Sequence, residues 1–293
     1  ERALAGQGTV VLLSGEAGSG KTTLVQEFAR RAQARHMDLL VALGQCDAQT
    51  GLGDPYLPFR EILRLLTGDV DSGLAAHTVS AENASRLRGA LTNSVDVLLE
   101  LTPDLVGLFL SNIPIAGFFV GAAKIVAEKA GWMDRLRQLA RGQGTPRGGV
   151  DLDQAHILEQ YTDFLRGLSA RQPILLVLDD VQWADAASLS LLFHLSRSLP
   201  SSRVLIVAAY RPAEVALGRG GERHPREKVL AEIKRYQGNV WVDLDRADPV
   251  ASRRFCDALL DCAPNGLGED FRAALCRQTE GHPLFTVELL CDL

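Results

Sequence analysis

The stretch VVLLSGEAGSGKTTLVQEFARR, Val10 to Arg31, decides the fold. An unbroken apolar run leads into a glycine-rich segment, and a helical pattern follows at once. The segment from Gly15 to Thr22 matches G-x-x-x-x-G-K-[ST] at every fixed position. A buried strand, a glycine-rich loop and a helix in this order predict a loop that wraps around phosphate groups.

Each residue type in this loop has an expected physical role. Glycines let the backbone close around phosphate oxygens, and the amides from Gly18 to Thr23 are expected to point at them. Lys21 is expected to reach the β and γ phosphates, and Thr22 to offer its hydroxyl to Mg²⁺. The expected nucleotide contacts in the loop are Gly15, Glu16, Ala17, Gly18, Ser19, Gly20, Lys21, Thr22 and Thr23.

A second motif, ILLVLDDVQWAD, ends an apolar strand in two carboxylates. Asp179 is expected to hold Mg²⁺ through its water shell, so Thr22 and Asp179 form the expected metal site. Asp180 is expected to activate the attacking water, and the alternative is a purely local hydrogen-bonding role. Asp185 is expected to cap the helix that begins at Ala186.

A third motif, VLIVAAYR, ends in Arg211. The carboxyl ends of parallel strands line the ligand crevice, so a cation there is expected to meet the γ-phosphate. Lys21, Asp180 and Arg211 are therefore the candidate catalytic residues. The alternative for Arg211 is a surface residue that pairs with Glu214 or another acid.

Strand and helix patterns alternate along the chain, which predicts an α/β fold with a parallel sheet. We expect a P-loop NTPase domain with a five-stranded, mainly parallel sheet flanked by helices. The expected strands lie in residues 9–15, 38–46, 174–179, 203–211 and 239–245, and the expected helices in residues 21–34, 55–66, 152–170, 187–199, 224–237, 249–261, 268–278 and from 283 onward.

Two domains are expected: a nucleotide-binding domain in residues 1–245 and the truncated start of a helical subdomain in residues 246–293. A helical insertion of about residues 67–149 interrupts the first domain. The apolar stretch from Leu105 to Ala127 has the length of a membrane span, but Asn112 and Pro114 lie in its middle. We expect two short buried helices with a turn between them and no membrane span. The alternatives are a hairpin that contacts a membrane or a partner, and a true span.

Composition narrows the functional classes. The 293 residues carry a formal net charge of −5 with no strong clustering of Lys and Arg, which argues against a nucleic-acid-binding face. The five cysteines form no CxxC pair, and we interpret them as reduced, mostly buried thiols of a cytoplasmic protein. The chain has no recognisable signal peptide and does not start with Met, so we expect it to be part of a longer protein.

The three motifs and a fourth, TEGHPLFTVELL from Thr279 to Leu290, together resemble the STAND family of signal-transduction ATPases. The resemblance maps a sensor arginine onto Arg211 and a G-x-P motif onto Gly281 and Pro283, with Pro283 near the adenine or ribose. GQCDAQTGLGDPYLPFREIL is similar to bacterial members that carry tetratricopeptide repeats. The family's winged-helix domain has no counterpart here, and its N-terminal GRE element is reduced to Glu1 and Arg2 or missing.

The resemblance implies an ATP-binding molecular switch that binds ATP or ADP with Mg²⁺ and hydrolyses ATP slowly in isolation. Such a module would belong to a larger signalling protein with its own sensor and effector domains and would self-associate through the full-length protein. The alternative is a work-coupled ATPase such as a ring-forming motor or loader. A module that holds ADP permanently and a small-molecule kinase remain further alternatives.

Overall fold

The computed structural model describes residues 1–47, 55–75, 78–102, 105, 154–216, 225–238, 240–246, 248–262 and 264–291. Its centre is a five-stranded sheet in the order β2-β3-β4-β1-β5. The strands are β1 (Thr9–Ser14), β2 (Leu40–Gln45), β3 (Ile174–Asp179), β4 (Val204–Tyr210) and β5 (Trp241–Asp243). Every paired strand runs parallel to its neighbour, so the expected α/β fold with a parallel sheet is confirmed.

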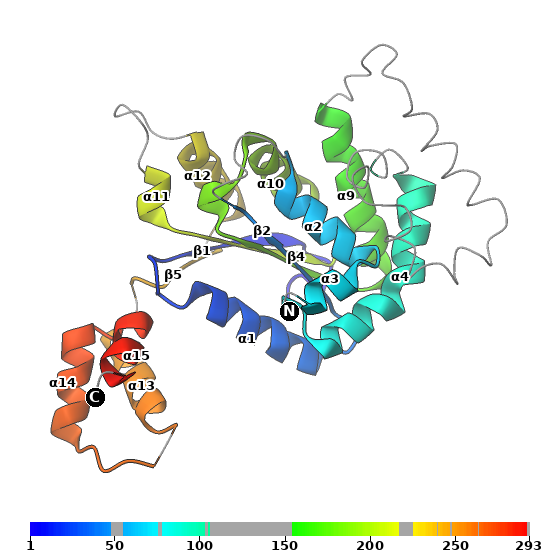
Figure 1. The fold of residues 1–293 in the computed structure, drawn as a ribbon. Coiled ribbons are helices and arrows are strands. Elements are labelled where there is room, and N and C mark those ends of the chain that lie inside the picture. The colour runs from blue at the N-terminus through cyan, green and yellow to red at the C-terminus, as the bar shows by residue number, and fades with distance from the viewer. Residues whose placement is uncertain are drawn as a thin grey trace.

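Helices cover both faces of the sheet (Figure 1). The helix α1 (Lys21–Arg35) lies on one face, and α2 (Leu57–Leu66), α9 (Gln154–Arg171), α10 (Ala186–Ser198) and α12 (Pro225–Gln237) lie on the other. The remaining elements are α3 (Val70–Ala75), α4 (Ala81–Leu101), the short 3-10 helix η1 (Val181–Trp183), α11 (Pro212–Ala216), α13 (Pro249–Leu260), α14 (Glu269–Thr279) and α15 (Pro283–Cys291).

Alternate residues of each central strand enter different cores. In β3, Ile174, Leu176 and Leu178 pack in the larger core, whereas Leu175 and Val177 pack beneath α1. A strand that is apolar at every position can serve both faces, because successive side chains point in opposite directions. This is the physical reason for the unbroken apolar run before the two carboxylates.

The fifth strand is shorter than the sequence predicted. Residues 239–245 were expected to be extended, but β5 covers only Trp241–Asp243. It is an edge strand that pairs with β1 alone, and Trp241 and Val242 are 38% and 44% exposed. An edge strand has one neighbour to support it, so its pairing ends early.

The insertion is helical where the structure describes it, through α3 and α4. The stretch from Leu105 to Ala127, apart from Leu105 itself, lies outside the described residues, so its expected hairpin stays a prediction. None of the helices within the described ranges is long and apolar enough to cross a bilayer. The boundary between residues 245 and 246 also stays a prediction, although only helices follow β5 in the described part of the chain.

The cysteines are all free thiols, but the expectation that most are buried was wrong. Cys46 and Cys256 are buried, Cys276 is intermediate, and Cys262 and Cys291 are exposed. Cys262 lies just after α13 and Cys291 is the last residue of α15, where short helices leave little core to enter.

Candidate nucleotide-binding site

The phosphate loop joins the carboxyl end of β1 to the start of α1. Gly18 and Gly20 have φ angles of 78° and 84°, which lie in the left-handed region that favours glycine. Gly20 caps α1 without a side-chain hydrogen bond, so the first amides of the helix have no capping side chain. Glu16, Ala17 and Gly18 are exposed at the tip of the loop, Gly15 and Ser19 are buried, and Thr22 and Thr23 face solvent. Free amides at a helix start suit an anion such as phosphate.

Lys21 is a nearly buried cation, 7% exposed, at the base of this loop. Its ammonium donates to the carbonyl oxygens of Gly15 at 2.7 Å and Glu16 at 2.8 Å. Burial lowers the pKa of the Lys21 ammonium and repulsion from Arg211 adds to this, while Asp179 and nearby carboxylates oppose it. A desolvated cation held only by neutral oxygens gains most from a bound anion. The loop therefore fits a polyphosphate.

Thr22 and Asp179 are brought together as the sequence predicted. The Thr22 hydroxyl donates to one carboxylate oxygen of Asp179 at 2.7 Å, and the Asp180 amide donates to the other at 2.9 Å. Hydroxyl and carboxylate oxygens are ligands that Mg²⁺ accepts, and Mg²⁺ keeps several of its waters in nucleotide sites. Among the described residues no cluster of three or more His, Cys, Asp or Glu side chains suits a metal. A site with two protein oxygens fits Mg²⁺ that is held largely by phosphates and water.

Asp180 adopts a left-handed backbone conformation with φ of 55°, directly after β3. Such a conformation costs a non-glycine residue about 1–3 kcal/mol, although Asp tolerates it better than most. The amide of Gln182, a residue that is only 1% exposed, donates to the Asp180 carboxylate at 2.6 Å. The side-chain oxygen Oε1 of Gln182 accepts from the backbone amide of Arg211 at 3.0 Å. One buried side chain therefore ties the candidate base to the end of β4.

Arg211 lies just past the carboxyl end of β4, as the sequence predicted. Its side chain also pairs with Glu214, which was the alternative interpretation of this residue. Its guanidinium donates to Glu214 at 2.8 Å and lies 3.5 Å from a carboxylate oxygen of Asp180. Within the described structure, the buried Nε of Arg211 and Oε2 of Glu214 have no hydrogen-bond partner. A buried polar atom without a hydrogen-bond partner costs free energy of folding. The Arg211–Glu214 pair therefore leaves part of its hydrogen-bonding capacity unused.

Asp245 and Glu16 hold the outer side of the loop, and the sequence analysis missed Asp245. The Glu16 amide donates to both carboxylate oxygens of Asp245 at 3.1 Å. The Glu16 carboxylate accepts from the Ala213 amide at the start of α11, also at 3.1 Å. Asp245 follows the last strand, and the rule that strand ends line the crevice was the signal that would have found it. Gln182 carried no comparable signal.

The helix α15 begins against the phosphate loop. The Leu284 amide donates to the Gly18 carbonyl at 3.2 Å. The Pro283 ring lies 3.6 Å from the position that a Cβ on Gly20 would take. Gly281 turns the chain with φ of 71°, and a Cβ there would stand 2.4 Å from that of Ser252 on α13. Pro283 therefore lies beside the phosphate loop, and its contact with adenine or ribose stays a prediction.

The insertion also reaches the site. A cavity of about 550 Å³ opens beside Thr22 and Asp179, and the start of α4 forms part of its wall. Asn83 of α4 accepts from Gln33 of α1 at 2.7 Å and donates to the Val41 carbonyl of β2 at 2.9 Å. These buried contacts attach α4 to α1, which carries Thr22, and to β2, which pairs with the strand that carries Asp179.

The parallel sheet, the phosphate loop and the Thr22–Asp179 pair together define a P-loop nucleotide-binding domain. The chain belongs to the AAA ATPase domain family, which matches residues 1–207. Its fold and family membership identify it as a P-loop ATPase domain.

Other known proteins resemble the chain more distantly. An uncharacterized protein of Rhizobium meliloti (strain 1021) is 28% identical over 219 residues, covering 72% of this chain and 17% of that protein. The chain thus spans about a sixth of the length of this relative. The bacterial conjugative coupling protein TrwBdeltaN70 is 14% identical with a TM-score of 0.27, covering 86% of this chain and 72% of its own. VirB4 of Thermoanaerobacter pseudethanolicus is 11% identical with a TM-score of 0.30, covering 87% and 81%.

Proposed function

We propose that this ATPase domain is a molecular switch whose conformation depends on whether ATP or ADP is bound. The observation that carries the proposal is the hydrogen bond between the Leu284 amide and the Gly18 carbonyl. It joins the C-terminal helices to the backbone of the phosphate loop. A phosphate loop that adjusts to the bound phosphates would move this contact. ATP and ADP would then shift the equilibrium between two conformations by the difference in their affinities for each.

Arg211 supplies the difference between ATP and ADP in this proposal. Its guanidinium is held by Glu214 at 2.8 Å and lies close to Asp180. A γ-phosphate is a stronger partner, because charge-assisted bonds to phosphate are short and often bidentate. ADP lacks this group, so Arg211 would stay with Glu214 when ADP is bound.

Slow hydrolysis follows from the position of the candidate base. The Asp180 carboxylate accepts from Gln182 at 2.6 Å and lies 3.5 Å from the Arg211 guanidinium, and both contacts use the same carboxylate oxygen. A general base must lie within hydrogen-bond reach of the water that it activates, and this oxygen is already occupied. Turnover is therefore expected to be slow as long as Gln182 holds this oxygen.

The wider proposal is that the module works inside a longer protein of the STAND type. Mg²⁺ would be held by Thr22 and Asp179, and Pro283 would close over the nucleotide. Self-association, separate sensor and effector domains, a link to tetratricopeptide repeats and a cytoplasmic location belong to the same proposal. The absence of disulfides among the five described cysteines is in keeping with a reducing compartment.

Amide hydrogen exchange of residues 279–291 tests the switch. We expect different protection in this segment with ADP and with a non-hydrolysable ATP analogue, each with Mg²⁺. The segment from 154 to 171 in α9 is the internal reference, since it lies away from the loop. Equal protection of residues 279–291 in both states would refute the proposal.

Turnover and assembly separate the switch from the alternative. A work-coupled motor would hydrolyse ATP continuously as a ring of identical subunits, and its turnover would rise with subunit concentration. We expect slow turnover that does not depend on the concentration of this chain. Rapid, concentration-dependent turnover would favour the motor.

A further inference from the structure

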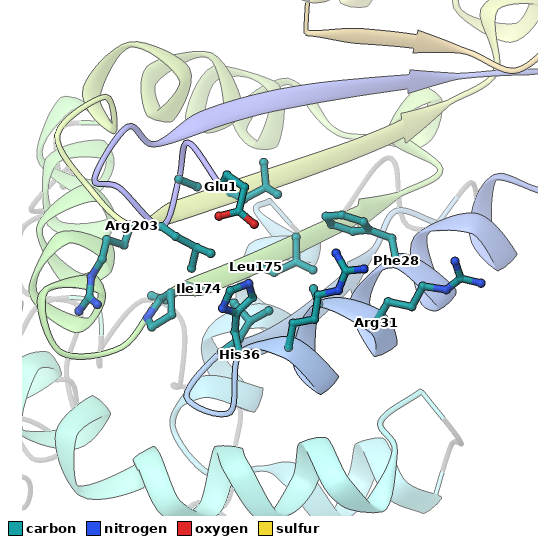
Figure 2. Close-up of a pocket in the computed structure, with 14 residues that line it drawn as sticks. Glu1, Phe28, Arg31, His36, Ile174, Leu175 and Arg203 are labelled. Atoms are coloured by element: carbon teal, nitrogen blue, oxygen red, sulfur yellow. The ribbon is translucent and has the colours of Figure 1, made fainter.

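A second pocket lies at the amino ends of the strands, whereas the phosphate loop lies at their carboxyl ends. It has a volume of about 290 Å³ and lies between the C-terminal half of α1 and the amino ends of β3 and β4 (Figure 2). Ile174 and Leu205 mark those strand ends, whereas the phosphate loop follows the carboxyl end of β1. The pocket is therefore separate from the nucleotide site.

The floor of this pocket is apolar. Leu39, Ile174 and Leu175 line it and are only 6%, 1% and 1% exposed. Phe28 of α1 lines it as well, yet its side chain is 45% exposed. Figure 2 shows Phe28 and Leu175 bordering the same hollow. A large aromatic side chain left half in water beside a buried apolar floor offers a surface that an apolar ligand would cover.

The rim of the pocket is basic. Three arginines line it, Arg31, Arg35 and Arg203, with Glu1 as the single acid among the described lining residues. Arg31 already pairs with Glu27, and Arg203 donates to the carbonyl oxygens at the end of α9. The Arg35 side chain has no hydrogen bond or ion pair with any residue in the described ranges.

The position of Arg35 restricts how a ligand would bind. It lies in the last turn of α1, where the helix dipole favours a positive charge. The same dipole repels an anion from the helix backbone, so an anionic group must meet the guanidinium at its tip. A neutral ligand would partly desolvate Arg35 without giving it a partner, and a cation would be repelled.

We propose that this pocket binds a small amphipathic anion, a carboxylate or sulfonate on an aromatic or aliphatic body. The body covers Phe28 and the apolar floor, and the anionic group pairs with Arg35. Guanidinium groups match such anions with two parallel hydrogen bonds. The proposal is independent of the switch, because the pocket shares no residue with the nucleotide site.

Isothermal titration with naphthoate tests the proposal, with the neutral naphthamide as the matched probe. The chain is first saturated with ADP and Mg²⁺, so that the nucleotide site is filled. We expect saturable binding of naphthoate at one site, about tenfold or more tighter than naphthamide, since a hydrogen bond to a charged group is worth about that factor. No saturable binding, or equal binding of the two probes, would overturn the proposal.

Two variants assign the binding to this pocket. Arg35→Glu is expected to weaken naphthoate binding by about tenfold or more. Arg235→Glu is the control, with the same charge change on an α12 side chain that is 80% exposed and lies outside the pocket. Ala32→Trp is expected to fill the pocket and abolish binding. Retained ADP binding shows that each variant is folded. If Arg35→Glu binds naphthoate as tightly as Arg235→Glu does, or if Ala32→Trp still binds it, the assignment is wrong.

Discussion

The Thr22 hydroxyl donates a 2.7 Å hydrogen bond to the carboxylate of Asp179, across 157 residues of sequence. Thr22 lies at the start of α1, after β1, and Asp179 is the last residue of β3. The strands β1 and β3 are not neighbours, because β4 lies between them. The contact therefore bridges the width of a strand at the carboxyl edge of the sheet. It is the part of the site that links phosphate binding to the acidic motif.

Removal of the Thr22 hydroxyl should weaken the response to Mg²⁺. In Thr22→Val, we expect the Mg²⁺ concentration that half-saturates ATP binding to rise by about tenfold, because one oxygen ligand is lost. Fluorescent-nucleotide titrations at several Mg²⁺ concentrations measure this. Thr22→Ser keeps a hydroxyl and should behave like the parent chain. Unchanged Mg²⁺ dependence in Thr22→Val would remove Thr22 from the metal site.

Lys21 predicts a pH dependence with a definite sign. Its pKa lies below 10.5 in the folded chain without nucleotide, so the folded state binds this proton less tightly than the unfolded state. The free energy of unfolding of the nucleotide-free chain should therefore rise with pH between the lowered pKa and 10.5. Phosphates favour the charged lysine, so ADP affinity should fall over the same window.

The free energy of unfolding and the ADP affinity are each measured at several pH values between about pH 7 and pH 10. Ordinary side-chain pKa values serve as the reference. Lys21→Met keeps the volume of the side chain but carries no proton. It should bind ADP weakly at every pH and lose the pH dependence that Lys21 contributes to stability. A variant with the slope of the parent chain would show that another group titrates.

Asp180→Asn should bind ATP and fail to hydrolyse it. The Asn carbonyl oxygen can still accept from Gln182, so the local geometry is kept while the base is removed. We expect turnover to fall by about 10²- to 10⁴-fold, the range typical of a lost general base. Phosphate release under single-turnover conditions measures it. Asp185→Asn, which alters the cap of α10 at another carboxylate, should hydrolyse ATP at the parent rate.

Arg211 and Glu214 should change nucleotide preference in opposite directions. Arg211→Ala should narrow the preference for ATP over ADP by about tenfold, since a charged contact to the γ-phosphate is lost. Glu214→Gln weakens the 2.8 Å pair and should widen the preference, because Arg211 is released. Competition of the two nucleotides for one fluorescent analogue gives both ratios. Changes of the same sign would refute a competition between Glu214 and phosphate.

The sequence predicted the parts of the site that repeat a strong local pattern. The loop from Gly15 to Thr22 follows β1, and Asp179 and Asp180 lie at the end of β3, as the local patterns predicted. Their roles toward phosphate and metal stay predictions. The cap at Asp185 was also confirmed, with its carboxylate accepting from Ala187 and Ser188. Local spacing decides these features, so sequence alone was sufficient.

Features that depend on which strands are neighbours were not predictable in this way. The order β2-β3-β4-β1-β5 places the ends of β3 and β4 side by side, and only then does Gln182 reach Arg211. A side-chain amide three residues past a strand looks like any polar loop residue. The sequence could not decide between the two roles proposed for Arg211. Glu214 is three residues away in any fold, and only the geometry shows whether the two side chains pair.

The hydrogen bond that joins α15 to the phosphate loop uses only main-chain atoms, the Leu284 amide and the Gly18 carbonyl. Replacement of the Leu284 side chain, with any residue except proline, leaves both atoms in place. The hydrogen bond can therefore persist in relatives that carry a different side chain at the position of Leu284. The exposed side chains of this helix can therefore differ between relatives while its hydrogen bond to the phosphate loop is kept.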